Sequence, residues 1–104
     1  MSNFIIKTRR NGEYQFNLKS ANGEIILTSE GYTTKNNCRK GIASVRLNAG
    51  INSRFVRKIS RYGKHYFNLK AGNGRIIGTS EMYNSRAGME KGVRAVRGRV
   101  GSLK

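Results

Sequence analysis

Positively charged side chains are the residues of this sequence best suited to chemistry with a partner. Twenty-one Lys and Arg stand against five acids, all of them Glu, which gives a formal net charge of +16. Twelve of these cations are Arg, whose planar guanidinium group can donate to phosphate in a fork. The residues predicted to contact nucleic-acid phosphates are Arg54, Arg57, Lys58, Arg61, Lys64, Lys91, Arg94, Arg97 and Arg99, together with Lys35, Arg39 and Arg46.

This charge is distributed unevenly along the chain. Residues 1–52 carry a net charge of +5, whereas residues 53–104 carry +11. Five cations and Tyr62 fall within residues 54–64 alone. So large an excess of one sign opposes compaction by self-repulsion, and an anionic partner would offset it. Nucleic acid is the commonest such partner for a small basic protein.

The other reactive side chains favour structural roles over catalysis. His65 is the only histidine, and it has no companion nucleophile. Cys38 occupies an apolar helical position, as expected of a small core residue. Glu30 and Glu81 recur in the motif Thr-Ser-Glu, where bonds to nearby backbone are favoured over acid–base work by paired carboxylates. The glycines of residues 72–78 lack the spacing of a dinucleotide-binding loop. We therefore expect no enzyme, no cofactor and no metal site.

The elements that position these residues occur twice. Residues 12–32 return, with about half of their positions identical, as residues 63–83, which is the signature of an internal repeat. A unit of this length can scarcely bury a core by itself, whereas two units can share one. We expect one domain over residues 1–104, with repeat one at 1–52 and repeat two at 53–104.

Each repeat begins with three predicted strands. Alternation of apolar and polar residues over 14–19 and 65–70 indicates half-buried strands. Short β-prone runs precede them at residues 4–8 and 55–59, and others follow at 24–29 and 75–80. Asn22-Gly23 and Asn73-Gly74 separate the second and third runs, and they predict hairpins with type I′ turns, which need a positive φ at both turn residues.

A helix is predicted to end each repeat. Cys38, Gly41, Ile42 and Val45 share one helical face, and Met89, Gly92, Val93 and Val96 repeat that pattern. Thr34 and Ser85 are the predicted N-caps. A glycine on the buried face of both helices suggests that each helix lies close to the sheet. The predicted fold is α+β, with two tandem β-β-β-α repeats forming one antiparallel sheet and both helices packed on one face.

The segment Gly-Glu-Tyr-Gln-Phe-Asn-Leu-Lys of residues 12–19, followed by Asn-Gly-Glu-Ile-Ile and Thr-Ser-Glu-Gly-Tyr up to Tyr32, resembles the YegP family, also called DUF1508 or UPF0339. The resemblance covers nearly the whole chain, in both copies. It implies an α+β fold in which two modules build a single sheet with helices against it. It implies no catalytic residue, ligand or activity, and the family is usually much less cationic than this chain.

The composition leads to a functional hypothesis. We expect an RNA-binding structural protein, ribosomal or ribosome-associated, that contacts rRNA phosphates, with adjacent ribosomal proteins as further partners. The alternatives are non-specific binding of double-stranded DNA and a protein-interaction module for acidic partners. No membrane partner and no small-molecule substrate are expected. A single cysteine and the lack of a long apolar run favour the cytoplasm.

Overall fold

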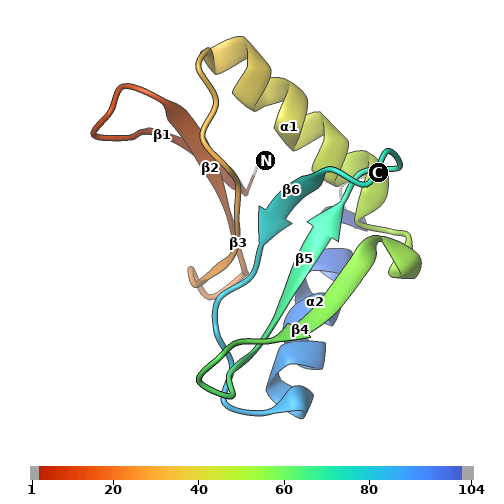
Figure 1. Ribbon diagram of the computed structural model, residues 1–104. Helices are drawn as coiled ribbons and strands as arrows, with labels where there is room; N and C mark the ends of the chain where they lie inside the picture. Colours follow the sequence, from red (N-terminus) through yellow and green to blue (C-terminus); the bar gives the residue numbers. More distant parts are fainter. Residues whose placement is uncertain (1–2, 102–104) are drawn as a thin grey trace.

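The computed structural model describes residues 3–101, which form six strands and two long helices in the predicted order (Figure 1). No helix in this part of the chain is both long enough and apolar enough to cross a membrane. Repeat one contains β1 (Phe4–Thr8), β2 (Tyr14–Lys19), β3 (Ile25–Thr28) and α1 (Lys35–Asn48). A short 3-10 turn, Asn52–Arg54, leads into repeat two, which contains β4 (Phe55–Ile59), β5 (His65–Lys70), β6 (Ile76–Thr79) and α2 (Arg86–Gly101).

All six strands belong to one antiparallel sheet, in the order β1-β2-β3-β6-β5-β4. The two repeats therefore meet at the centre of the sheet, where β3 pairs with β6 through Thr28 and Thr79. The outer pairs are longer and have matching registers, with Phe4 opposite Leu18 in repeat one and Phe55 opposite Leu69 in repeat two. This arrangement confirms the predicted α+β fold.

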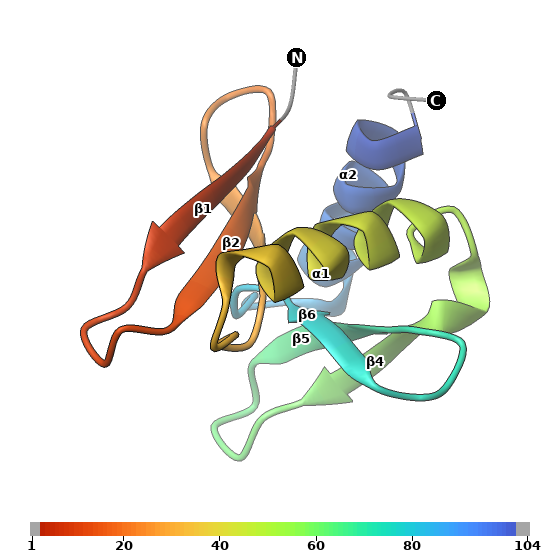
Figure 2. The ribbon, with the colours of Figure 1, turned by 90° about the horizontal axis from the view of Figure 1, so that it is seen from above.

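Both helices pack on the same side of this sheet, in the angle between its two three-stranded halves (Figure 2). Helix α1 contacts β2 of its own repeat and β5 and β6 of the other repeat, while α2 contacts β5 and β3. Each helix thus spans the two repeats. The fully buried side chains include Phe16 and Leu18 together with their counterparts Phe67 and Leu69, in one shared cluster.

Local hydrogen bonds explain where the helices begin. The Thr34 hydroxyl accepts from the Asn37 amide at 3.0 Å and caps α1. The Ser85 hydroxyl accepts from the Gly88 amide at 3.0 Å at the start of α2. Such bonds satisfy amides that have no partner within the first helical turn. Both predicted N-caps are confirmed.

The recurring Thr-Ser-Glu motif also has a local structural role. The Ser29 hydroxyl accepts from the Phe16 amide at 2.9 Å and donates to the Glu30 carbonyl at 2.8 Å. Ser80 makes the same pair of bonds in repeat two. The serine joins two backbone groups where the strand ladder ends, while the Glu30 side chain is exposed.

The hairpins form where they are predicted, but their turn type is different. Gly23 and Gly74 each have a φ of +86°, whereas no described residue other than glycine has a positive φ. A type I′ turn would require a positive φ at Asn22 as well. Instead the Gly23 amide donates to the Ser20 carbonyl at 3.0 Å, and the Ser20 amide donates to the Glu24 carbonyl at 2.8 Å. The glycine therefore closes a longer loop, and the type I′ prediction is wrong.

Candidate anion-binding pocket

The twelve cations predicted to contact phosphates lie on the β4–β5 hairpin, the segment before it and both helices. Arg46 is exposed, and its guanidinium carbon lies 5.2 Å from the centre of the Phe4 ring. The other exposed members are Lys58, Arg61 and Lys64 on the hairpin, Lys35 and Arg39 on α1, and Lys91 and Arg94 on α2. Among them, Lys64 donates to the Asn84 side chain and Arg61 lies over the Tyr62 ring.

Arg57 is held by partners within the protein. Its Nε and Nη2 atoms donate to the two Glu90 carboxylate oxygens at 3.0 and 3.1 Å, and Nη2 also donates to the Asn52 side chain at 3.0 Å. The hydrogen bond from Arg57 lowers the pKa of Glu90, against the opposing effect of desolvation. A bidentate pair of this kind leaves Arg57 less free to bind an external phosphate.

Other predicted contacts are partly withdrawn into the fold. Arg97 donates to the Gly50 carbonyl at 3.4 Å, and Arg99 donates through Nε to the Lys19 carbonyl at 3.3 Å. Arg54 is half-buried, and its Nε atom has no hydrogen-bond partner among the described residues. The predicted set is therefore a mixture of exposed surface cations and cations that are bonded within the fold.

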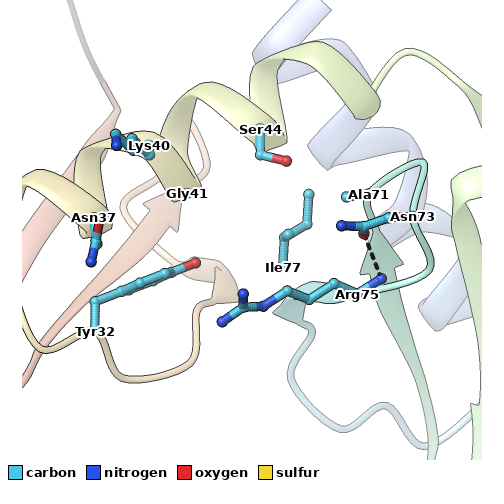
Figure 3. Close-up of a pocket in the computed structure, with 9 residues that line it drawn as sticks. All are labelled: Tyr32, Asn37, Lys40, Gly41, Ser44, Ala71, Asn73, Arg75 and Ile77. Atoms are coloured by element: carbon cyan, nitrogen blue, oxygen red, sulfur yellow. Dashed lines mark hydrogen bonds between the residues drawn. The ribbon is translucent and has the colours of Figure 1, made fainter.

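A different group of polar residues lines a pocket of about 340 Å³ between α1 and the β5–β6 hairpin (Figure 3). Repeat one provides one wall and repeat two provides the other. Ala71 and the buried Ile77 provide apolar lining. The polar lining consists of Tyr32, Asn37, Lys40, Ser44, Asn73 and Arg75.

Tyr32 is fixed at one end of this pocket. Its backbone exchanges two hydrogen bonds of 2.7 Å with Tyr14, and its ring stacks on Phe16 with centroids 6.4 Å apart. The hydroxyl lies against α1 at Gly41, where a Cβ atom would be only 2.4 Å from it. The glycine in the helix therefore leaves space for the tyrosine that follows β3. We predicted that this glycine lets the helix lie close to the sheet, and the structure shows that the group it accommodates is the tyrosine hydroxyl.

Arg75 is positioned by the turn before β6. The Asn73 side chain accepts from the Arg75 amide at 3.0 Å, which orders the backbone just ahead of the strand. From there the exposed Arg75 side chain runs toward Tyr32 (Figure 3). Burial raises the pKa of Tyr32, and the positive charge of Arg75 partly offsets that rise. The Tyr32 hydroxyl can act as a hydrogen-bond donor to an anion.

Helix α1 supplies the opposite wall. Asn37, Lys40, Gly41 and Ser44 follow the spacing i, i+3, i+4 and i+7 and so form one stripe along the helix. This polar stripe runs beside the apolar stripe that faces the core. An ammonium group, an amide and a hydroxyl therefore line the pocket from the helix, while a guanidinium group lines it from the hairpin.

The arrangement can bind an anion. Two of the lining residues are cations and none is an acid. Guanidinium and ammonium groups make charge-assisted hydrogen bonds with phosphate and carboxylate oxygens, and these are stronger than bonds between neutral groups. The amides and hydroxyls can complete the coordination of such an anion.

The sequence prediction did not include Lys40 or Arg75 among its site residues. Lys40 directly follows the predicted Arg39, and Arg75 stands apart from other cations on the hairpin before β6, so nothing in the sequence links the two. One signal was present in the repeat itself, since Arg75 occupies the position of Glu24 in repeat one. A reversal of charge at one position of two otherwise similar repeats indicates that the side chain there is not required by the fold that both repeats share.

Comparison with known proteins places the chain among relatives of similar size. A 48% identical UPF0339 protein from Shewanella oneidensis aligns over 86 residues, which are 83% of this chain and 78% of the relative. The UPF0339 protein YegP of Escherichia coli (strain K12) is 46% identical over 90% of this chain and 86% of its own length. The solution NMR structure of YegP from E. coli superposes with a TM-score of 0.89 at 44% identity, covering 93% of this chain and 84% of that one.

These relatives contradict the functional hypothesis drawn from composition. YegP is described as a protein of unknown function, and none of these relatives is described as ribosomal or as RNA-binding. The hypothesis of a ribosomal or RNA-binding protein, with duplex DNA or an acidic protein as the alternative partner, is therefore wrong. A high net charge is a property of the whole surface, and by itself it does not specify a binding site.

The family model describes the two repeats directly. The domain of unknown function DUF1508 matches residues 10–55 and again residues 60–102, so each match covers most of one repeat. Together with the relatives at 46–48% identity, these matches show that the chain belongs to the DUF1508 family, which includes the UPF0339 and YegP proteins.

Proposed function

We propose that this protein binds a small organic anion, through a phosphate or carboxylate group, in the pocket between α1 and the β5–β6 hairpin. The observation that carries the proposal is the convergence of Lys40 from one repeat and Arg75 from the other on a single pocket without acids. The proposal departs from the sequence-based expectation that no small molecule is bound.

The size of the pocket favours a small ligand. A volume of about 340 Å³ is near the lower end of the ~300–1,000 Å³ typical of small-molecule sites. The apolar lining from Ala71 and Ile77 can pack against the carbon skeleton of such a ligand, while the polar groups hold its charged end. A polymer would instead need an extended surface on which several phosphates are contacted in register.

Binding across two repeats would also affect stability. An anion held by both Lys40 and Arg75 links α1 of repeat one to the hairpin of repeat two. A ligand that binds only the folded state stabilises it in proportion to its concentration relative to Kd. Binding should therefore raise the melting temperature as well as shift resonances near the pocket.

The test is a titration of the ¹⁵N-labelled protein followed by NMR. The probes are inorganic phosphate, glycerol 3-phosphate and acetate, each compared with sodium chloride at matched ionic strength. We expect saturable shifts centred on the amides of Lys40, Ser44 and Arg75. The phosphate and acetate arms distinguish a phosphate-selective site from one that accepts carboxylates.

Arg75→Glu is the decisive variant. A hydrogen bond to a charged group contributes about 1.5–3 kcal/mol, so losing the guanidinium should weaken binding by roughly tenfold or more. Arg10→Glu is the matched control, because it changes the net charge equally at an exposed residue of the β1–β2 hairpin. Equal weakening by both variants, or shifts that do not centre on the pocket, would overturn the proposal.

A further inference from the structure

The tip of the β4–β5 hairpin exposes two large apolar side chains. Tyr62 is 80% exposed and Ile59 is 65% exposed. They are three residues apart: Ile59 ends β4 and Tyr62 lies in the turn that joins β4 to β5, at the end of a projecting hairpin (Figure 1). Exposed aromatic and aliphatic side chains gathered in one place are typical of a surface that meets a partner.

The backbone of this tip satisfies its own polar groups. The Ser60 amide donates to the Lys64 carbonyl at 2.8 Å, and the Gly63 amide donates to the Ser60 carbonyl at 2.9 Å. The Ser60 hydroxyl accepts from the amides of Tyr62 and Lys64 at 3.3 and 3.2 Å. A tip whose amides are already bonded loses less free energy when water is partly removed around it.

Cations surround the two apolar side chains. Lys58, Arg61 and Lys64 are exposed on the hairpin itself. Arg86, at the start of α2, lines a groove of about 270 Å³ together with Lys58 and Ile59. No acid lines this groove, and none occurs in the hairpin sequence from residue 55 to residue 70.

The corresponding hairpin of repeat one has the same backbone arrangement but different side chains at its tip. Thr8, Asn11 and Glu13 occupy the positions of Ile59, Tyr62 and Lys64. Glu13 there accepts from Arg9 at 3.4 Å and from Asn11 at 3.1 Å. Both hairpins carry two exposed cations at matching positions, Lys7 and Arg10 in repeat one and Lys58 and Arg61 in repeat two. What distinguishes repeat two is its exposed apolar pair and a lysine in place of the self-paired Glu13.

We propose that the β4–β5 hairpin docks on a membrane surface rich in anionic lipid. Tyr62 and Ile59 lie at the level of the headgroups, where amphipathic aromatic rings are favoured. Lys58, Arg61, Lys64 and Arg86 face the lipid phosphates. Apolar contact and attraction to anionic lipid act together in such peripheral attachment, and neither requires a segment that spans the membrane. The proposal is independent of the anion pocket and replaces the sequence-based expectation of no membrane partner.

A single tryptophan can report on this docking, because the chain contains none of its own. The Tyr62→Trp variant is mixed at physiological salt with vesicles of phosphatidylcholine alone or of equal parts phosphatidylcholine and phosphatidylglycerol. We expect a blue shift of its emission, and quenching by brominated lipid, only with the anionic vesicles. The Asn11→Trp variant places the same reporter on the other hairpin, and we expect neither change from it.

A second pair of variants measures affinity by vesicle co-sedimentation. Ile59→Thr combined with Tyr62→Asn gives the tip the corresponding residues of repeat one, and we expect partitioning to fall by about tenfold with the net charge unchanged. Similar shifts from both reporters, or an unchanged affinity in the double variant, would show undirected adsorption of a basic protein and overturn the proposal. Two unshifted reporters, as expected if the tip docks on another protein, would also overturn it.

Discussion

The residues that line the pocket between α1 and the β5–β6 hairpin have counterparts in the other half of the molecule, where some of them line two separate pockets instead of one. The residues 51 positions away place Tyr83 opposite Gly92, as Tyr32 lies opposite Gly41, and a Cβ at either glycine would be 2.4 Å from the tyrosine hydroxyl. Asn22 accepts from the Glu24 amide at 3.2 Å, as Asn73 does from the Arg75 amide. The two sites therefore share the same tyrosine–glycine contact and the same turn before the third strand of the repeat.

The two sites differ in the charge of their side chains. Glu24 stands in place of Arg75, and the hydroxyl of Ser44 has no counterpart at Ala95. The effect is visible at the two tyrosines. Burial raises the pKa of both, and the matching residues Glu30 and Glu81 each raise the pKa of the nearby tyrosine, but Arg75 lowers the pKa of Tyr32 whereas Glu24 raises that of Tyr83. The two repeats therefore share the same backbone arrangement at these sites, and the side-chain differences make only one of the two sites suited to an anion.

The largest expected effect tests the contact between a helical glycine and a tyrosine that both repeats share. Gly41→Ala and Gly92→Ala each force a methyl group against a packed tyrosine, so each should destabilise the protein by about 1–3 kcal/mol, as overpacking typically does. Urea unfolding measures both. Only Gly41→Ala should also weaken anion binding, because only Tyr32 lines the anion pocket. A harmless Gly92→Ala would show that the two contacts differ.

The next effect tests the difference in charge. Glu24→Arg gives the groove beside Tyr83, the second groove, an arginine in the position of Arg75. We expect a second set of anion-induced NMR shifts, at residue 24 and Tyr83, with an affinity about tenfold weaker because Gly88 and Ala95 stand in place of Asn37 and Ser44, a loss of about 1.4 kcal/mol. If Glu24→Arg left the second groove unable to bind, charge would not be what distinguishes the two sites.

The smallest effect concerns an ion pair present in only one repeat. Ile6 and Arg39 occupy the repeat-one positions of Arg57 and Glu90. Because the folded pKa of Glu90 is lowered, chiefly by its bond from Arg57, this contribution is present above the unfolded pKa and is lost as the pH falls through the folded value. With side chains 30% and 28% exposed, the pair should contribute about 1 kcal/mol or less.

Comparison of the urea midpoints of the native protein and the Glu90→Gln variant between pH 7 and pH 3 measures this contribution. The difference between the two proteins should shrink as the pH falls. Glu81→Gln is the control, since Glu81 is exposed. A difference that is constant with pH would mean that Glu90 acts through packing and not through its charge.

Most of the fold could be predicted because its signals are local. Alternation placed β2 and β5, the helical spacing of Cys38 and Val45 placed α1, and the hydroxyls of Thr34 and Ser85 marked the helix starts. The turn type was the exception, since a type I′ turn and the observed longer loop both place glycine at a positive φ. What differs is the conformation of Asn22, which the dipeptide alone does not decide.

The candidate site could not be predicted in the same way. Lys40 and Arg75 become neighbours of one pocket only because α1 of repeat one lies over the β5–β6 hairpin of repeat two. Arg57, by contrast, looks like a free cation in the sequence and proves to be bonded to Glu90 on α2. Clusters of charge along a chain record proximity in sequence, and binding requires proximity in space.

The strands, the helices and the existence of two equivalent halves follow from the amino-acid sequence alone, because hydrophobic periodicity and capping act over a few residues. Which cations stay exposed, which glycines lie against a tyrosine and which side chains share a pocket can be seen only in the folded molecule. Those outcomes depend on how one repeat packs against the other. The pairing of β3 with β6 at Thr28 and Thr79 sets that packing, and with it the meeting of Lys40 and Arg75.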